Sequence, residues 1–273
     1  MKELSLPEIR QRQVLLLEWF DKFCKDNALR YSLAGGTLLG AVRHGGYIPW
    51  DDDIDVMMPR PDYDKFVKLT RDYDSNNVSV FSPIYTPKKQ VLPFSYIKVC
   101  DTSTLLIEKE KTKKIEYFIY IDVFPIDGFP STEKHQKKYV KKYTNINLIV
   151  QVLFLAKYNI RYGSCWRKIL WYCIYGISKV LDGKFILQYI ENKLRKIDFN
   201  SSEYCGNVFC GYGIKECIHR SAFNITTISF ERKSFSCIEG YKEYLTNLYG
   251  DYMQLPPKEK QVLCHDYSAY SLD

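Results

Sequence analysis

The chain has 273 residues, of which 46% are hydrophobic and 26% charged, the composition of an ordinary globular protein. Its 14 glycines and 11 prolines are too few for a collagenous or low-complexity chain, and a chain of this length can bury a core without disulfides or a structural metal. The formal net charge of +7 suits an anionic partner as well as it suits plain solubility. Composition therefore excludes a disordered, fibrous or disulfide-stapled protein and leaves the function open.

Nine cysteines, an odd number, follow an N-terminus without the small-residue cleavage site of an export signal. This combination predicts free thiols in a cytosolic compartment. Cys205, Cys210 and Cys217 raise the question of a zinc site, but their spacing matches none of the common ligand pairs, and free thiols are favoured. No stretch reaches the ~18 apolar residues that a membrane span needs.

The secondary structure is predicted from hydrophobic periodicity and from the positions of glycine and proline. In chain order the pattern predicts a helix over 6–27, a strand over 30–34, a helical piece over 38–42, a strand over 53–58, a helix over 61–72, strands over 78–81, 94–99 and 117–124, about three helical segments over 134–197 with breaks near Gly163 and Asp182-Gly183, and a last helix over 241–249.

These elements predict an α+β fold, with a mixed β-sheet in the first half and a helical addition in the second. No internal repeat or linker-like stretch divides the chain, so a single domain is expected, with a core over 1–130, a helical insertion over 131–200 and a C-terminal segment over 201–273 that completes it. The stretches 146–156 and 169–181 fit either amphipathic helices on a membrane surface or two core helices packed on each other, and the core helices are favoured.

The strongest chemical signal is the run of carboxylates at Asp51, Asp53 and Asp55. On an extended strand, residues two apart share a face, so Ile54 and Val56 would point to the opposite, core face. Carboxylates that project together repel one another unless a cation lies between them, and oxygen ligands of this kind suit Mg²⁺ or Mn²⁺. The alternative is an acidic surface loop, but the alternation of polar and apolar residues favours a metal site.

Gly35 and Gly36 directly follow a predicted strand and precede a helix that starts at Thr37. Glycines in this place let backbone N–H groups approach a phosphate, and the helix start adds the positive end of its dipole. A pair of glycines alone is weak evidence. Followed within about twenty residues by a carboxylate strand, it predicts a site for a phosphate and its metal.

A third carboxylate comes from Asp122, because the apolar residues Ile119, Ile121 and Val123 would occupy the other face of its strand. Such a carboxylate can bind a metal and can also accept the proton of an attacking hydroxyl. Asp127 lies at a turn beside a glycine and is expected to be structural.

The segments around these residues closely resemble the signature of the LicD family of phosphocholine-type transferases, of which fukutin and fukutin-related protein carry a related version. The matching blocks are Gly35-Gly36-Thr37 through Trp50-Asp-Asp-Asp-Ile-Asp-Val-Met-Met-Pro-Arg60, then Tyr120-Ile-Asp-Val-Phe-Pro-Ile-Asp-Gly128, Phe230-Glu231, and Tyr244-Leu through Leu248-Tyr-Gly-Asp-Tyr-Met-Gln-Leu-Pro-Pro257. They span nearly the whole chain, whereas the stretch between Lys134 and Ser202 matches nothing specific.

The resemblance implies a nucleotidyltransferase-like core and the transfer of a phosphorylated alcohol, such as phosphocholine, from a CDP-linked donor to a glycan hydroxyl, with release of CMP. Mg²⁺ or Mn²⁺ would be the cofactor. The acceptor would be a cell-surface glycan such as lipopolysaccharide, teichoic acid or capsule, in a lipid-linked form if the protein works at the inner face of the membrane. A cytoplasmic enzyme, with a peripheral membrane contact, is the expectation.

Carried over by position, the resemblance makes Asp53, Asp55 and Asp122 the catalytic carboxylates and metal ligands, with Asp51 as a further ligand. A second set is expected to contact the donor phosphates, through backbone N–H groups or through side-chain donors matched to anionic oxygens. This set comprises Gly35, Gly36, Thr37, Arg43, His44 and Lys98. For Arg43, His44 and Lys98 an ordinary surface salt bridge is the alternative.

The chain departs from the family pattern in one loop. The family usually has Phe-Glu-Gly and then a proline, whereas Arg232 follows Glu231 here and Ile238-Glu239 stands near the place of that proline. This departure concerns donor or acceptor recognition and leaves the acidic core untouched. His265 resembles a histidine that the family places there, and only an indirect contact with the site is expected from it.

Two other functions remain open at this stage. A true nucleotidyltransferase acting on a sugar or small molecule would share the metal site and differ in which phosphorus is attacked. A non-catalytic nucleic-acid-binding protein would suit the net positive charge, but the acidic site and the lack of a basic recognition helix argue against it. The lysine-rich run over 134–142 is more simply a solvated helix face.

Overall fold

The computed structural model describes residues 1–71, 73–75, 77–85, 95–110, 113–159, 165–181, 183–209, 212–263 and 266–272. Its helices are α1 (Leu6–Asp26), α2 (Gly35–His44), α3 (Arg60–Leu69), α4 (Glu133–Asn159), α5 (Cys165–Val180), α6 (Gly183–Leu194) and α7 (Tyr241–Tyr249). Its strands are β1 (Lys2–Leu4), β2 (Ser32–Leu33), β3 (Asp55–Pro59), β4 (Asp74–Ser75), β5 (Val78–Phe81), β6 (Ile97–Glu110), β7 (Lys113–Phe129), β8 (Tyr204–Gly206), β9 (Ile218–His219), β10 (Ile225–Phe230), β11 (Lys233–Ile238) and β12 (Tyr267–Ser271).

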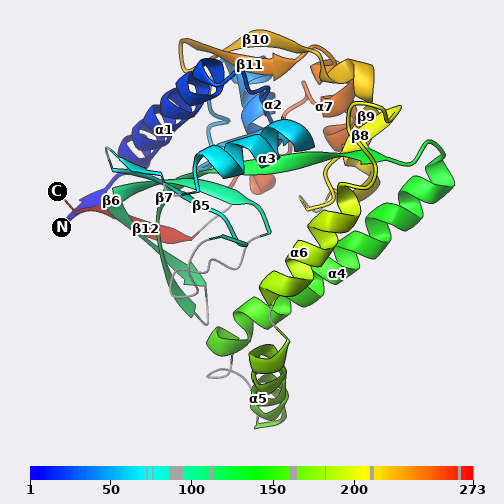
Figure 1. The fold of residues 1–273 in the computed structure, drawn as a ribbon. Helices are drawn as coiled ribbons and strands as arrows, with labels where there is room; N and C mark the ends of the chain where they lie inside the picture. Colours follow the sequence, from blue (N-terminus) through cyan, green and yellow to red (C-terminus); the bar gives the residue numbers. More distant parts are fainter. Residues whose placement is uncertain are drawn as a thin grey trace.

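The main sheet has the strand order β1-β12-β6-β7-β3-β2, with β5 added to β6 and β8 added to β7. The pair β3–β7 is parallel, whereas the other strand pairs of the described residues are antiparallel. Strands β10 and β11 form a separate hairpin. The predicted α+β class with a mixed sheet is therefore confirmed (Figure 1).

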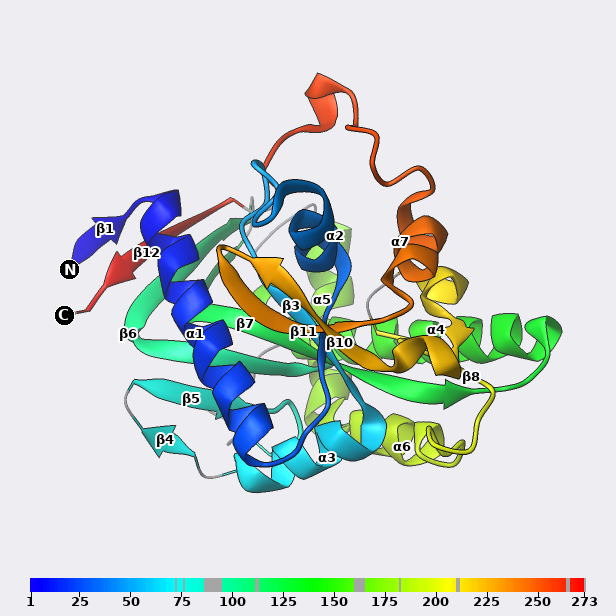
Figure 2. The ribbon, with the colours of Figure 1, turned by 90° about the horizontal axis from the view of Figure 1, so that it is seen from above.

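Helix α1 begins with a capping box, in which Ser5 and Glu8 satisfy each other's backbone N–H groups, and has proline in its first turn. Its apolar face contributes Phe20, which is fully buried, and the helix packs against β6 and β7. Figure 2 shows α1 crossing these strands, with the β10–β11 hairpin beside it. The predicted helix over 6–27 is thus confirmed and covers one face of the sheet.

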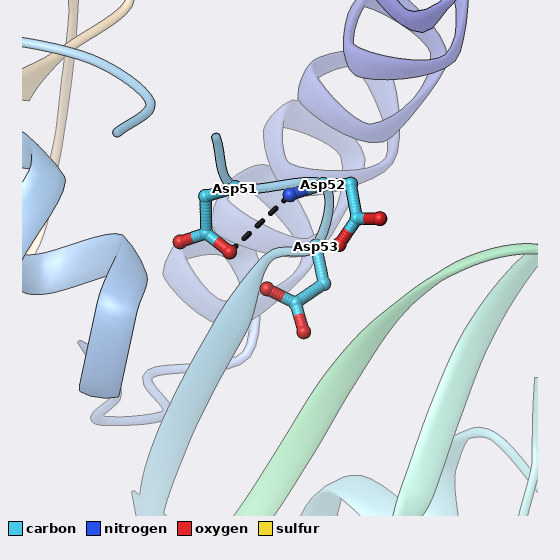
Figure 3. A group of neighbouring side chains, drawn as sticks. All are labelled: Asp51, Asp52 and Asp53. Atoms are coloured by element: carbon cyan, nitrogen blue, oxygen red, sulfur yellow. Dashed lines mark hydrogen bonds between the residues drawn. The ribbon is translucent and has the colours of Figure 1, made fainter. Parts of the chain in front are cut away.

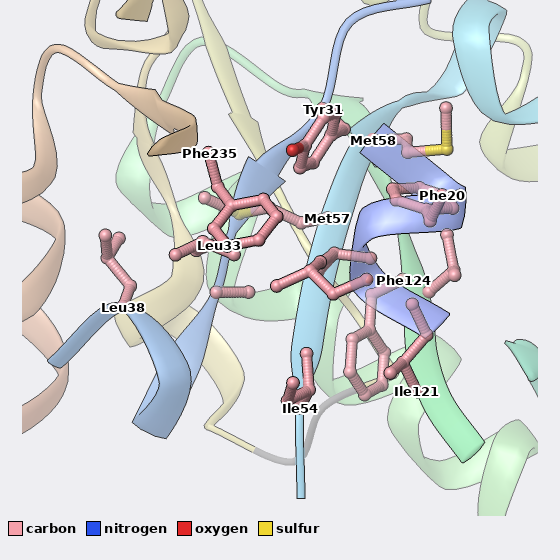
Figure 4. Packing of buried hydrophobic residues seen from close by; sticks show 14 of the residues in the cluster. Phe20, Tyr31, Leu33, Leu38, Ile54, Met57, Met58, Ile121, Phe124 and Phe235 are labelled. Atoms are coloured by element: carbon pink, nitrogen blue, oxygen red, sulfur yellow. The ribbon is translucent and has the colours of Figure 1, made fainter. Parts of the chain in front are cut away.

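Strand β3 lies in the middle of the core (Figure 4). Val56, Met57 and Met58 are all at most 1% exposed, so both faces of the strand are covered. A parallel strand with both faces buried is held firmly by its neighbours, and its N-terminal end is therefore a fixed point of the fold. The candidate carboxylates stand at this end.

Helices α4 and α6 pack on each other around a second core, to which Phe129, Val140, Val150, Leu187 and Ile190 contribute. Helix α5 contacts α4 but has no buried residue. The expectation that the stretches 146–156 and 169–181 form a buried pair of helices is therefore wrong for the second stretch. In the described parts of the chain, none of the helices has both the length and the apolarity that a bilayer crossing requires.

Strand β5 and helix α7 have the predicted bounds, and the long helical region is divided into three helices as predicted. Other elements differ. Helix α2 starts at Gly35, before the expected start at Thr37, so the two glycines belong to its first turn. Strand β3 starts at Asp55 rather than Asp53, because residues 51–54 form a loop. The β10–β11 hairpin, the edge strand β1 and the strand β12 between β1 and β6 were not predicted.

Candidate active site

The acidic loop, residues 51–54, connects α2 to β3 and is fastened from behind by α1. Arg10 donates from Nη2 to the backbone carbonyls of Asp51 at 2.6 Å and Pro49 at 2.9 Å. Gln13 donates from Nε2 to the carbonyl of Asp52 at 2.9 Å. Because these bonds use the backbone oxygens, they fix the loop without using its carboxylate oxygens.

The side chains of Asp51, Asp52 and Asp53 each offer a carboxylate oxygen within 4.8 Å of the other two (Figure 3). The backbone N–H of Asp52 donates to Asp51 Oδ1 at 3.2 Å. Asp52 was not among the predicted site residues, and the loop conformation brings its side chain together with those of Asp51 and Asp53. Three oxygens of hard carboxylate type form a donor set that fits a divalent cation.

Asp55 and Asp122 complete the acidic region from the sheet. They are partners in the register of the parallel strands β3 and β7, and the Asp122 N–H donates to the carbonyl of Ile54 at 2.9 Å. The Asp55 N–H donates to Thr37 Oγ1 at 2.8 Å. Thr37 is 2% exposed, so its hydroxyl holds Asp55 in place from the first turn of α2.

Gly35 and Gly36 provide space beside the carboxylates. A Cβ atom at Gly36 would lie 2.7 Å from Asp51 Oδ2, closer than real Cβ contacts allow, and one at Gly35 would lie 3.2 Å from Asp55 Oδ2. Gly35 also has a φ of +49°, which favours glycine, and its N–H donates to the hydroxyl of Tyr244 at 3.3 Å. The predicted juxtaposition of the glycine pair with the acidic segment is therefore present.

Lys98 is a buried partner of Asp122. The two residues face each other across β6 and β7, with Lys98 Nζ 2.5 Å from Asp122 Oδ1, and Lys98 is 1% exposed. Its ammonium also lies 3.2 Å from the ring centroid of Tyr120. Lys98 thus reaches the acidic region from inside the sheet, next to Asp122.

The carboxyl groups of the site raise one another's pKa. Burial, followed by the nearby charge of Asp53, raises the pKa of Asp51 to about 8. Burial raises the pKa of Asp55 well above its usual range, and Asp53, Asp122 and Asp51 add to the effect, whereas Lys98 opposes it. The protein therefore holds more carboxylates here than its own cations neutralise, which is the electrostatic condition for binding a metal ion.

A pocket of about 510 Å³ opens beside these carboxylates. Asp51, Asp53 and Asp55 line one part of it, and Gly36 and Arg43 lie next to them. The remaining wall combines apolar and aromatic side chains with the segment after α7. It comprises Leu39, Ile48, Trp50, Tyr212, Tyr249, Asp251, Tyr252, Gln254, Leu255, Pro256 and Pro257. No functional residue was predicted in this wall. The block Tyr244 to Pro257 had been noticed only as a resemblance.

The other predicted donor contacts have different surroundings. Arg43 lines the pocket, but its Nη1 donates to the backbone carbonyls of Tyr252 at 2.9 Å and Gln254 at 3.2 Å, so it holds the segment after α7 over the site. Partial burial lowers its pKa. His44 is exposed at the end of α2, with its ring 6.4 Å from that of Trp50.

Glu231 fastens the turn that follows α2. Its Oε1 accepts a hydrogen bond from the N–H of Tyr47 at 3.0 Å, and its own N–H donates to the carbonyl of Gly45 at 3.0 Å. Glu231 and Arg232 form the tip of the β10–β11 hairpin with φ values of +50° and +63°. Arg232 thus occupies a left-handed position that suits the glycine expected by resemblance.

The remaining candidates contribute nothing to the site as described. Cys205 and Cys217 are free thiols, whereas Cys210 and His265 lie outside the described residues. Among the described residues, Asp51–Asp53 is the group of at least three metal-binding side chains. The zinc question therefore finds no support from the two described cysteines.

Comparison with known proteins agrees with the motifs. The family LicD/FKTN/FKRP, nucleotidyltransferase domain, matches residues 28–154, which hold all the carboxylates of the site. The lipopolysaccharide cholinephosphotransferase LicD of Haemophilus influenzae is 31% identical over 284 aligned positions, with 100% of each chain covered. The ribitol 5-phosphate transferase FKRP of Homo sapiens is 64% identical over 28 residues, 10% of this chain and 6% of that protein.

Half of this chain is also similar to mannosyltransferase regulator 4 of Saccharomyces cerevisiae. The two are 28% identical over 140 residues, which are 50% of this chain and 11% of that protein. The matching family model is described as a nucleotidyltransferase domain, and in this chain the matched region brings carboxylates and a glycine pair to the end of a central strand. The full-length similarity identifies the branch, and the chain belongs to the LicD family.

Proposed function

We propose that the protein is a metal-dependent transferase that moves a phosphorylated alcohol, phosphocholine or a close analogue, from a CDP-linked donor to a hydroxyl group of a cell-surface glycan. The observation that carries this proposal is the pocket itself, in which Asp51, Asp53 and Asp55 face an aromatic wall. A nucleotide donor has both an anionic diphosphate, which needs a cation, and a flat base, which packs on aromatic rings. The full-length similarity to a lipopolysaccharide cholinephosphotransferase supports the nature of the transferred group.

In this proposal Asp51, Asp53, Asp55 and Asp122 would hold the metal, Mg²⁺ or Mn²⁺. A bound divalent cation would neutralise the donor diphosphate and the charge that develops on the leaving CMP. The supporting observation is the donor set: carboxylate oxygens of Asp51, Asp52 and Asp53 lie within 4.8 Å of one another.

The chain's own residues would then orient the reactants. The acceptor oxygen forms a bond to the phosphorus that carries the alcohol, the bond from that phosphorus to the CMP oxygen breaks, and the hydroxyl proton passes to Asp122. Lys98 Nζ lies 2.5 Å from Asp122 Oδ1 and so holds this carboxylate in position. Gly35, Gly36 and Thr37 lie at the start of α2, where the dipole favours the donor phosphates, and Arg43 holds the segment that covers them.

We place this reaction in the cytoplasm, at the inner face of the membrane, where a lipid-linked acceptor would be met. Free thiols belong to a reducing compartment, and we propose that the cysteines of this chain stay reduced there. The core over 1–130, the insertion over 131–200 and the C-terminal segment over 201–273 are proposed to act as one domain, since β12 of the last segment pairs with β6 of the first.

The experiment is a thermal-stability titration of the purified protein with CDP-choline, CDP-ribitol, CTP and ATP, each with and without Mg²⁺. Ligand that binds the native state raises the melting temperature by mass action. A metal-dependent rise with one CDP-alcohol, absent in Asp53→Asn, is the expected result and names the donor. A rise with CTP or ATP alone would replace the proposal by a true nucleotidyltransferase. Function left intact in Asp53→Asn would contradict both enzymatic functions.

A further inference from the structure

Helix α5 presents an apolar surface that the rest of the protein leaves uncovered. Its partly buried residues Trp171, Ile174 and Tyr175 recur at the spacing of one helix face, and α5 packs on α4. Figure 1 shows α5 at the far end of α4, away from the sheet. A helix whose apolar residues occupied only this packed face would be an ordinary surface helix.

The opposite side of α5 is also apolar. Trp166 is 81% exposed, Leu170 57%, Ile177 50% and Val180 86%. With the exposed Cys173, these residues follow one another at intervals of three and four, so they form a continuous stripe along the helix. Large apolar side chains gathered on one exposed face mark an interaction surface rather than the scattered exposure of an ordinary protein surface.

The charge of this region is unusually one-sided. Residues 134–181 contain ten of the chain's 39 basic residues and none of its 32 acidic ones. The rest of the chain therefore has more acidic than basic residues, and the positive net charge of the protein comes from this helical region. Within α5, Arg167, Lys168 and Lys179 are exposed beside the apolar stripe.

We infer that α5 docks the protein on the surface of a bilayer that contains anionic lipids. Helices that lie in a membrane interface combine an apolar face carrying tryptophan and leucine with basic residues that meet the lipid phosphates. The exposed Trp166 and Tyr172, which is 61% exposed, suit the headgroup level of such an interface. A second copy of the chain is a poorer occupant, because pairing through α5 would bring two acid-free cationic surfaces together.

The test is co-sedimentation of the full-length protein with vesicles of phosphatidylcholine, with or without phosphatidylglycerol. Binding to the anionic vesicles is expected to exceed binding to the neutral ones by about tenfold and to fall sharply in 0.5 M NaCl, because salt screens the attraction to the lipid charges. Equal binding to both vesicle types, or no binding at low salt, would overturn the inference.

Two comparisons between variants test whether α5 makes the contact with the membrane. The triple variant Trp166→Gln, Leu170→Gln, Ile177→Gln is expected to lose binding, whereas Leu15→Gln, which replaces a 53% exposed leucine on α1, is expected to keep it. The double variant Arg167→Glu, Lys168→Glu is expected to lose binding, whereas Lys22→Glu, Lys242→Glu, with the same change in net charge, is not. Wild-type binding in the triple variant would contradict the role of α5.

Measuring the oligomeric state distinguishes docking on a membrane from self-association through α5. Sedimentation equilibrium without vesicles is expected to show the same mass for the wild type and the triple variant. A wild-type dimer that the triple variant converts to monomers would overturn the membrane assignment and give α5 to self-association. Because every substituted residue is exposed and distant in sequence from the carboxylates, metal-dependent nucleotide binding remains as a check of folding.

Discussion

Asp55 and Asp122 stand at the same register position of the parallel strands β3 and β7, with Lys98 facing Asp122 from β6. Three neighbouring strands thus place two carboxylates and one ammonium group in a row at the edge of the site. One lysine cannot neutralise the carboxylates of this row and of the adjacent loop. Burial and this excess of negative charge raise the pKa values of Asp51 and Asp55. A divalent cation would restore the balance.

The buried pair Lys98–Asp122 is expected to couple strongly in a double-mutant cycle. Asp122→Asn leaves a buried ammonium group without its carboxylate and is expected to lower the free energy of unfolding by about 3 kcal/mol. Lys98→Met is expected to destabilise as well, because it leaves the carboxylates without their cation. Urea unfolding of both single variants and of the double variant should give a coupling energy of about 1–3 kcal/mol. Simple additivity would contradict the pairing.

Metal binding is expected to strengthen as the pH rises through about 8, the pKa of Asp51. This pKa lies above the value of 3.8 for an ordinary aspartate, so between these two pH values the native state holds a proton that the unfolded chain has lost. The free protein therefore loses stability as the pH rises through this window. Metal ligands must be deprotonated, so Mg²⁺ competes with that proton.

The corresponding measurement is the rise in melting temperature caused by Mg²⁺ at pH 6.5 and at pH 8.5. A larger rise at the higher pH is expected for the wild type, and a smaller pH dependence for Asp51→Asn. A Mg²⁺ effect of equal size at both pH values, unchanged in Asp51→Asn, would exclude Asp51 as a metal ligand.

Asp127 belongs to the same sequence block as Asp122 but has a structural role. It is fully buried and accepts two hydrogen bonds from Arg60, from Nε at 2.6 Å and from Nη2 at 2.8 Å. Asp127→Asn would leave the buried guanidinium without its main countercharge and is expected to cost about 3–5 kcal/mol of stability by urea unfolding. Glu133→Gln, which breaks the exposed pair with Lys137, should leave the free energy of unfolding nearly unchanged. Equal losses in the two variants would contradict this account.

Arg232→Gly is expected to stabilise the protein. Arg232 has a φ of +63° at the second central residue of the two-residue hairpin turn, where glycine is favoured. The gain should be about 0.5–1 kcal/mol in thermal or urea unfolding, with relief of the strained backbone exceeding the added freedom of the unfolded chain. Gly45→Ala provides the opposite control, since Gly45 has a φ of +70° and the substitution is expected to destabilise. Loss of stability in Arg232→Gly would show that the arginine side chain matters more than the backbone.

Local sequence patterns predicted much of the fold because the elements concerned carry their own signals. Helix α1 has a capping signal and apolar residues at helical spacing, and β5 and α7 are bounded by turn residues. The β10–β11 hairpin was missed because its tip is Glu231-Arg232, which lacks the Asn-Gly or Asp-Gly signal of a tight turn. Strand β12 was missed because its pairing with β6 joins distant parts of the chain.

Part of the site could also be predicted from local sequence patterns. Asp51, Asp53 and Asp55 line one pocket as expected, since they are close in sequence. The grouping of Asp52 was missed because it depends on a loop conformation fixed by Arg10 and Gln13 of α1. The aromatic wall around Tyr212 and Tyr249 depends on long-range packing that periodicity does not encode. The carbonyl contacts of Arg43 are likewise set by tertiary structure.

The central claim is that the protein uses these carboxylates to catalyse the transfer of a phosphorylated alcohol from a CDP-linked donor to a glycan, with release of CMP. The direct measurement is product analysis by mass spectrometry after incubating the protein with Mg²⁺, the CDP-alcohol that stabilises it and a glycan acceptor. The account predicts CMP together with a glycan whose mass rises by one phosphorylated alcohol, both absent with Asp53→Asn and both lost on chelation of the metal. Pyrophosphate release from CTP with a nucleotide left on the acceptor, or unchanged turnover in Asp53→Asn, would contradict it.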